Sequence, residues 1–182
     1  MNITDLLLGK ETSGSVSELA RQFGISEEQA RGAVASLAPS LARGMQQQTK
    51  KDSGLDSLID ALNNGDHSKY IDDPGVLGRS ETTKDGNSIL GHIFGSKEVS
   101  RNVATHAAQE TGLGSTVLKK MLPVVATMVM GSLGKKLLGG GTTTAAPARQ
   151  QSAGILGSLL DSDKDGSIID DVLGMAFKAA FR

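Results

Sequence analysis

The sequence contains no cysteine and no tryptophan, and aromatic residues make up only 3% of it. Without cysteine the chain can form no disulfide bond, no thiolate metal site and no cysteine nucleophile. A β-sandwich or β-barrel normally contains more aromatic and β-branched residues, which argues against an all-β fold. An excess of one charge is also missing, because 19 Lys and Arg balance 20 Asp and Glu. No overall positive field favours a polyanion, so we do not expect a nucleic-acid partner.

Long hydrophobic segments are missing as well. The first residues lack the basic start and the apolar core of a signal peptide. The longest apolar run, residues 121–133, is shorter than the roughly 20 residues that a membrane-spanning helix needs. Its length favours a buried core helix, and the lysines on both sides leave an interfacial membrane anchor as the alternative. We therefore expect no transmembrane segment and a cytoplasmic location.

The composition favours helices that are separated by glycine-containing turns. Hydrophobic residues make up 38% of the sequence, and 23 of its 182 residues are glycine. Ser15, followed three residues later by a glutamate, predicts an N-terminal helix cap, and Gly24 predicts the left-handed end of that helix. Ser26, followed three residues later by a glutamine, predicts the cap of a second helix. Pro39 predicts a break or kink in this second helix. The fold class that we predict is all-α.

The same order of signals returns about 85 residues later. A capped helix over 97–111 ends at Gly112, and Pro123 interrupts the next helix, as Gly24 and Pro39 do earlier. Val-Ser pairs at 16–17 and 99–100 add to the likeness. We interpret this as an internal duplication of helix-turn-helix units, although any two amphipathic helix pairs look somewhat alike. The units would span 15–49 and 97–136 and pack around a central apolar helix over 122–138.

The composition changes sharply after residue 138. We predict a duplicated helical domain over 1–138, a flexible Gly/Thr/Ala linker over 139–152, and a C-terminal arm over 153–182. The arm contains an Asp-rich loop and then a helix with an apolar face. Such a face on a tether must dock on its own domain or on a partner.

The segment ILGHIFG at residues 89–95 precedes a helix, a Gly-Leu stop, a Leu-Pro pair and an apolar helix. In this order the chain resembles the YidB-like bacterial family, a domain of unknown function. The likeness extends from about residue 15 and is most specific over 88–136. It implies an all-α fold and a bacterial origin, and it brings no catalytic residue with it.

Asp161, Asp163 and Asp165, followed by a glycine, form the first half of an EF-hand-type calcium loop. Ser167 would offer its backbone carbonyl, and Asp171 is the nearest acid to the position of the usual bidentate ligand, where Val172 stands. The candidate calcium ligands are therefore Asp161, Asp163, Asp165, Ser167 and Asp171. The alternative is an Asp/Gly turn that caps the following helix.

Residues 18–34 also resemble a DNA-binding helix-turn-helix, but Glu27 and Glu28 would face the phosphates and repel them. We find no phosphate-binding loop, nucleophile elbow or histidine pair at metal-ligand spacing, and we expect His92 and His106 on partly buried helix surfaces. The sequence thus predicts no enzyme. It predicts a non-catalytic interaction or structural module that contacts a protein partner, or a second copy of itself, through apolar helix faces. A DNA-binding regulator is the alternative.

Overall fold

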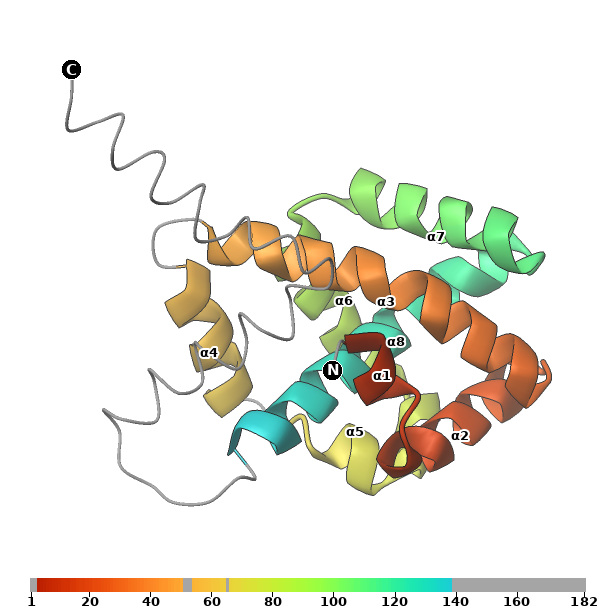
Figure 1. Cartoon of the computed structure of the whole chain (residues 1–182), viewed down its shortest axis with the longest axis horizontal. Helices are drawn as coiled ribbons and strands as arrows, with labels where there is room; N and C mark the ends of the chain where they lie inside the picture. The colour runs from red at the N-terminus through yellow and green to blue at the C-terminus, as the bar shows by residue number, and fades with distance from the viewer. Residues whose placement is uncertain (1–2, 51–53, 65, 139–182) are drawn as a thin grey trace.

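The computed structural model describes residues 3–50, 54–64 and 66–138, and this part of the chain is helical without any strand (Figure 1). The predicted all-α class is therefore confirmed. The predicted linker and arm lie outside the described residues, so the division into domains stays a prediction. The helices are α1 Ile3–Leu7, α2 Ser13–Phe23, α3 Glu27–Thr49, α4 Gly54–Asn64, α5 Lys69–Asp72, α6 Ser80–Phe94, α7 Lys97–Thr111 and α8 Ser115–Leu138, with 3₁₀ turns η1 Lys10–Thr12 and η2 Pro74–Gly78.

The turn between α2 and α3 forms as the sequence predicts. Gly24 has φ +63°, a left-handed conformation that glycine adopts at little cost. The Ile25 N–H donates to the Ala20 carbonyl at 3.0 Å, which satisfies a carbonyl at the end of α2. The Gln29 N–H then donates to Ser26 Oγ at 3.1 Å, and the Ser26 N–H donates to Gln29 Oε1 at 3.0 Å. This capping box confirms the predicted start of α3.

The predicted cap at Ser15 is wrong. Helix α2 begins two residues earlier, at Ser13, and Ser15 is fully buried within its first turn. Its hydroxyl donates to the Tyr70 carbonyl at 3.2 Å, across to α5. Because Ser15 lies inside the helix, two residues after its first residue, it does not occupy the capping position. The local sequence does not reveal its contact with Tyr70.

Helix α3 continues through Pro39 without a break. A proline inside a helix removes one hydrogen bond and clashes with the preceding turn, at a cost of about 3 kcal/mol. Leu37, Ala38, Leu41 and Ala42, on both sides of the proline, are buried. Their packing holds the helix together, so the stretch after Pro39 is part of α3.

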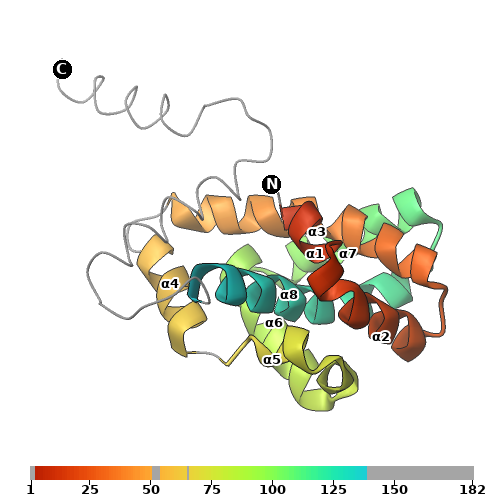
Figure 2. The ribbon, with the colours of Figure 1, turned by 60° about the horizontal axis from the view of Figure 1, so that its bottom comes forward.

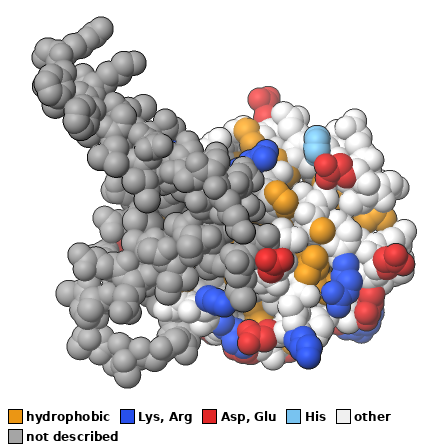
Figure 3. All heavy atoms as spheres, viewed as in Figure 1, with side chains coloured by type: hydrophobic (Ala, Val, Ile, Leu, Met, Phe, Trp, Pro, Cys, Tyr) orange, Lys and Arg blue, Asp and Glu red, His pale blue; other side chains and the backbone are white. Residues whose placement is uncertain are grey.

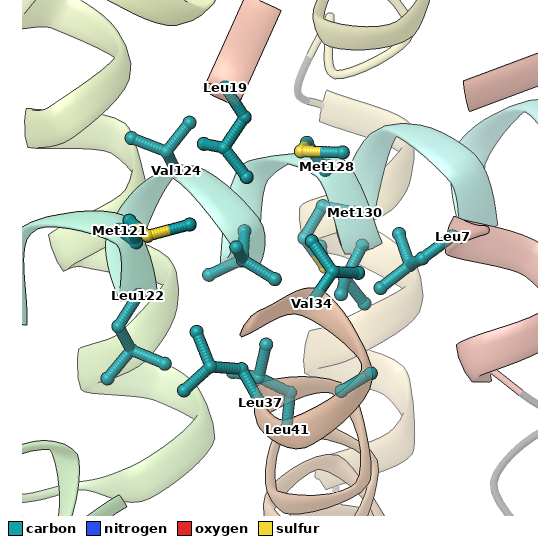
Figure 4. Close-up of a cluster of buried hydrophobic side chains, with 14 of the residues drawn as sticks. Leu7, Leu19, Val34, Leu37, Leu41, Met121, Leu122, Val124, Met128 and Met130 are labelled. Atoms are coloured by element: carbon teal, nitrogen blue, oxygen red, sulfur yellow. The ribbon is translucent and has the colours of Figure 1, made fainter. Parts of the chain in front are cut away.

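Helix α8 contacts each of the other α-helices, α1 to α7. Figure 2 shows α3 on one side of α8, with α5 and α6 on the other. Every residue from 121 to 134 is buried, and Leu7, Leu19, Val34, Leu37 and Leu41 surround its side chains (Figure 4). By length and composition, Ser115–Leu137 is the one helix in the described part of the chain that could cross a membrane, and most of it is buried inside the protein. The described residues thus contain no clear transmembrane segment.

Helices α6 and α8 meet at a glycine. A Cβ atom added at Gly86 would overlap the Pro123 carbonyl group. The backbones of the two helices therefore touch there, and this close approach fixes α6 against α8. It also places the other end of α6 beside the first turns of α7 and α8.

Candidate binding cleft

A cleft of about 620 Å³ opens between α6, α7 and α8. Its lining is polar and basic around the opening and apolar at the bottom. The lining residues are Asn87, Leu90, Gly91, Gly95, Ser96, Lys97, Ser100, Arg101, Lys119 and Leu122.

A two-residue turn brings α6 and α7 to the cleft. Gly95 ends α6 with φ +67°, and its N–H donates to the Gly91 carbonyl at 2.9 Å. Ser96 then caps α7, since its Oγ accepts from the Glu98 N–H at 3.1 Å. The short turn directs the N-terminus of α7, with its partial positive charge, toward the cleft.

Three cations line the cleft. Lys97 and Arg101 are four residues apart on α7 and therefore share a face, and Lys119 comes from α8. All three side chains are exposed, and none makes a hydrogen bond or ion pair with another described residue. No acidic residue is among the described lining residues. Within the part of the chain that the structure describes, the cleft therefore presents positive charge that no acidic lining residue balances.

The floor of the cleft is apolar, and the exposed Gly91 beside it leaves free space. Leu90 and Leu122 are buried, and a Cβ atom added at Gly91 would meet no atom within 4 Å. No histidine or carboxylate among the described lining residues stands ready to activate the hydroxyls of Ser96 and Ser100. The arrangement suits the binding of a ligand that is both anionic and apolar.

Comparison with known proteins identifies the family. The model of the family described as bacterial protein of unknown function, DUF937, matches residues 5–136. The chain belongs to this family. No curated protein and no solved structure matches it. The finer YidB-like assignment stays a prediction.

The DUF937 match contains the whole cleft and ends before the Asp-rich loop. The predicted ligands Asp161, Asp163, Asp165, Ser167 and Asp171 lie outside the described residues, so the calcium site stays a prediction. Within the described residues no group of three or more His, Asp or Glu side chains could hold a metal ion.

The structure places Glu27 and Glu28 in the exposed first turn of α3, and Ser17 Oγ donates to Glu27 Oε1. The nearby Arg21 is paired with Glu18 at 2.7 Å. Both glutamates are thus exposed, and the DNA-binding alternative, with the repulsion expected from them, stays a prediction.

His92 and His106, which we expected on partly buried surfaces, are both exposed. The ring of His106 instead lies near Glu110, with Nδ1 3.6 Å from its carboxylate. Glu110 lines a second, more open groove between α3 and α7, together with Glu28. Each groove thus carries one sign of charge, whereas acidic and basic side chains are interspersed on the face in Figure 3.

The cationic cleft is not predictable from the sequence. The spacing of Lys97 and Arg101 indicates a shared helix face, but nothing in the sequence links that face to Lys119. Only the packing of α7 against α8 brings the three side chains to one cleft.

Proposed function

We propose that this chain is a non-catalytic, cytoplasmic protein-interaction module, and that the cleft between α6, α7 and α8 binds an acidic, partly apolar segment of protein. The observation that supports it is the lining: three cations without partners in the described chain surround an apolar floor. A bound segment would pair its carboxylates with Lys97, Arg101 and Lys119. Its aliphatic side chains would cover the floor, which combines specificity with buried apolar area.

A matched pair of lysines on α8 tests this proposal. Lys119 lines the cleft, whereas its neighbour Lys120 is also exposed and does not. Fluorescence anisotropy with a labelled peptide of aspartate and leucine measures binding to the full chain. We expect Lys119→Glu to weaken binding about tenfold and Lys120→Glu to change it little, because only Lys119 lines the cleft. Both variants change the net charge equally, so a difference between them reports on position.

A second variant separates shape from charge. Gly91→Phe places a ring in the open space of the cleft and should block the peptide without changing the charge. Equal losses in Lys119→Glu and Lys120→Glu, or binding that survives Gly91→Phe, would contradict the proposal. Preferential, salt-dependent binding of duplex DNA by the same protein would favour the regulator instead.

We infer further that the two halves of the domain are duplicated helical units packed around α8. Gly112 follows Gly24 by 88 residues, and at this offset buried positions of α2 and α3 coincide with buried positions of α7 and α8. The pairs are Val16 with Ala104, Leu19 with Ala107, Leu37 with Val125, Leu41 with Val129 and Met45 with Leu133. The Val-Ser pairs do not support the repeat, since Val16 is buried whereas Val99 is exposed. Unrelated helix directions on superposing residues 16–45 on 104–133 would contradict it.

We also propose that Asp161, Asp163, Asp165, Ser167 and Asp171 bind calcium weakly, and that the chain is YidB-like within its family. Three converging carboxylates repel one another unless a cation lies between them. Because Val172 stands where the bidentate acid belongs, we expect a Kd of about 10⁻⁴ to 10⁻³ M. An NMR titration with calcium should shift the Asp amides in the wild type and not in the Asp163→Ala, Asp165→Ala variant. If the Asp amides show no saturable shift, the alternative stands, in which the Asp/Gly turn only caps the following helix.

A further inference from the structure

We infer that the C-terminal arm of the same chain occupies the cleft, through residues 161–171. This inference rests on the proposed function of the cleft and names its ligand. It makes the arm an internal competitor of any external acidic segment.

The composition of the arm complements the lining of the cleft. Residues 161–171 contain five aspartates and one lysine, with Ile168 and Ile169 among them. Carboxylates of this segment would face Lys97, Arg101 and Lys119, whose side chains have no partner among the described residues. The two isoleucines would cover Leu90 and Leu122 on the floor. In the described chain, Val99 is the one large hydrophobic side chain that is exposed. Exposed segments that combine carboxylates with large aliphatic side chains are therefore scarce there.

The length of the tether fits the distance. Leu122, on the floor of the cleft, lies 16 residues before the end of α8 at Leu138, or about 24 Å along the helix axis. Between Leu138 and Asp161 lie 22 residues, of which we predict 139–152 to be a flexible linker. If all 22 behaved as a flexible chain, their r.m.s. span would be about 26 Å. A tether that matches its span gives an effective concentration in the millimolar range. Even a weak contact between arm and cleft would therefore be substantially populated.

The absence of cysteine allows a direct test in the full chain. A nitroxide on Ser158→Cys, just before the segment, would broaden the NMR signals of nearby amides. We expect the amides of Gly91, Gly95 and Ser96 to lose at least half of their intensity in calcium-free, low-salt buffer. The charge reversals Arg101→Glu and Lys119→Glu, made together, should restore the intensity, because they repel the arm.

Two controls identify the interaction. Arg79→Glu with Lys120→Glu reverses two exposed charges outside the cleft lining and should leave the broadening in place. Asp170→Lys with Asp171→Lys, added to the reversed cleft, should bring the broadening back. The inference would be overturned if the amides of the cleft showed no broadening. It would also be overturned if the broadening did not change when the charges of the cleft and of the arm are reversed.

A mixture of two proteins distinguishes binding within one chain from binding between two copies. One protein carries the nitroxide and no NMR-active isotope, and the other carries the isotope and no nitroxide. Broadening that persists in this mixture shows that the arm of another copy binds, and it too would overturn the inference. An acidic peptide added to the Asp170→Asn, Asp171→Asn chain distinguishes the two proposals. If that peptide shifts Gly91 and Gly95 while the spin label never broadens them, the arm inference fails and the proposed function stands.

Discussion

Gly86 and Gly91 lie five residues apart on α6 and meet opposite surroundings. The first touches the Pro123 carbonyl of α8, and the second faces the open cleft. Neither has the left-handed backbone that only glycine tolerates cheaply. A side chain added at Gly86 would therefore clash with α8, whereas one added at Gly91 would not. Backbone conformation permits a side chain at both positions.

Replacing each of these glycines with alanine should change stability in opposite directions. Gly86→Ala forces α6 away from α8 and should lower the free energy of unfolding by about 2 kcal/mol or more. Gly91→Ala has room and should raise it by about 0.5–1 kcal/mol, because alanine loses less backbone entropy in a helix. Urea denaturation followed by circular dichroism measures both, and equal effects would show that the contact with Pro123 is not tight.

Tyr70 joins α5 to α6 through a single polar contact. Its ring is 1% exposed, and its hydroxyl donates to a carboxylate oxygen of Asp85. Burial, together with the adjacent Asp85 carboxylate, raises the pKa of Tyr70 well above its usual value. The folded protein therefore keeps this proton at a pH where the unfolded chain releases it.

This difference predicts how stability depends on pH. The unfolded chain titrates its tyrosine near pH 10, so the contribution of Tyr70 is complete below about pH 10 and is lost as pH rises toward the folded pKa. Tyr70→Phe should remove this dependence and cost about 1–2 kcal/mol at pH 7, because Asp85 loses its donor. The chain has one tyrosine and no tryptophan, so absorbance near 295 nm follows this group alone. An ordinary midpoint near pH 10 in the folded protein would contradict the account.

At the scale of elements, the sequence predicts the turn between α2 and α3 correctly, but not the start of α2 or the continuity of α3. Gly24 and Ser26 act within one turn of backbone, so local residues suffice to predict them. Pro39 and Ser15 depend on distant partners: the core packing around α3 keeps the helix whole, and Tyr70 takes the serine hydroxyl. Local signals are reliable only where no tertiary contact competes with them.

Helix α8 offers the sharpest test of the core. Val125 is fully buried, and an unpaired carboxylate there costs several kcal/mol. We expect Val125→Asp to abolish cooperative unfolding, with Lys120→Asp on the exposed side of the same helix as the control. A folded Val125→Asp protein that binds liposomes would instead support the membrane-anchor interpretation of residues 121–133.

At the scale of the whole molecule, the sequence predicts the all-α class from its composition and its periodicity. It does not predict the cleft, because Lys119 joins Lys97 and Arg101 only after α7 packs against α8. The sequence does indicate the Asp-rich loop, because the spacing of its aspartates is local. The charge of that loop is opposite to the charge of the cleft lining. The family match adds no chemistry of its own, since the function of the family is unknown.

The central claim is that the cleft between α6, α7 and α8 is the binding site. The most direct measurement maps the amide shifts of the Asp170→Asn, Asp171→Asn chain while an aspartate- and leucine-containing peptide is added. We expect saturable shifts at Gly91, Gly95 and Lys97, which weaken as salt is raised. In Gly91→Phe the shifts at Gly95 and Lys97 should disappear. Shifts confined to the acidic groove between α3 and α7, at Gly32 and Ala35, or no saturable shift at all, would contradict it.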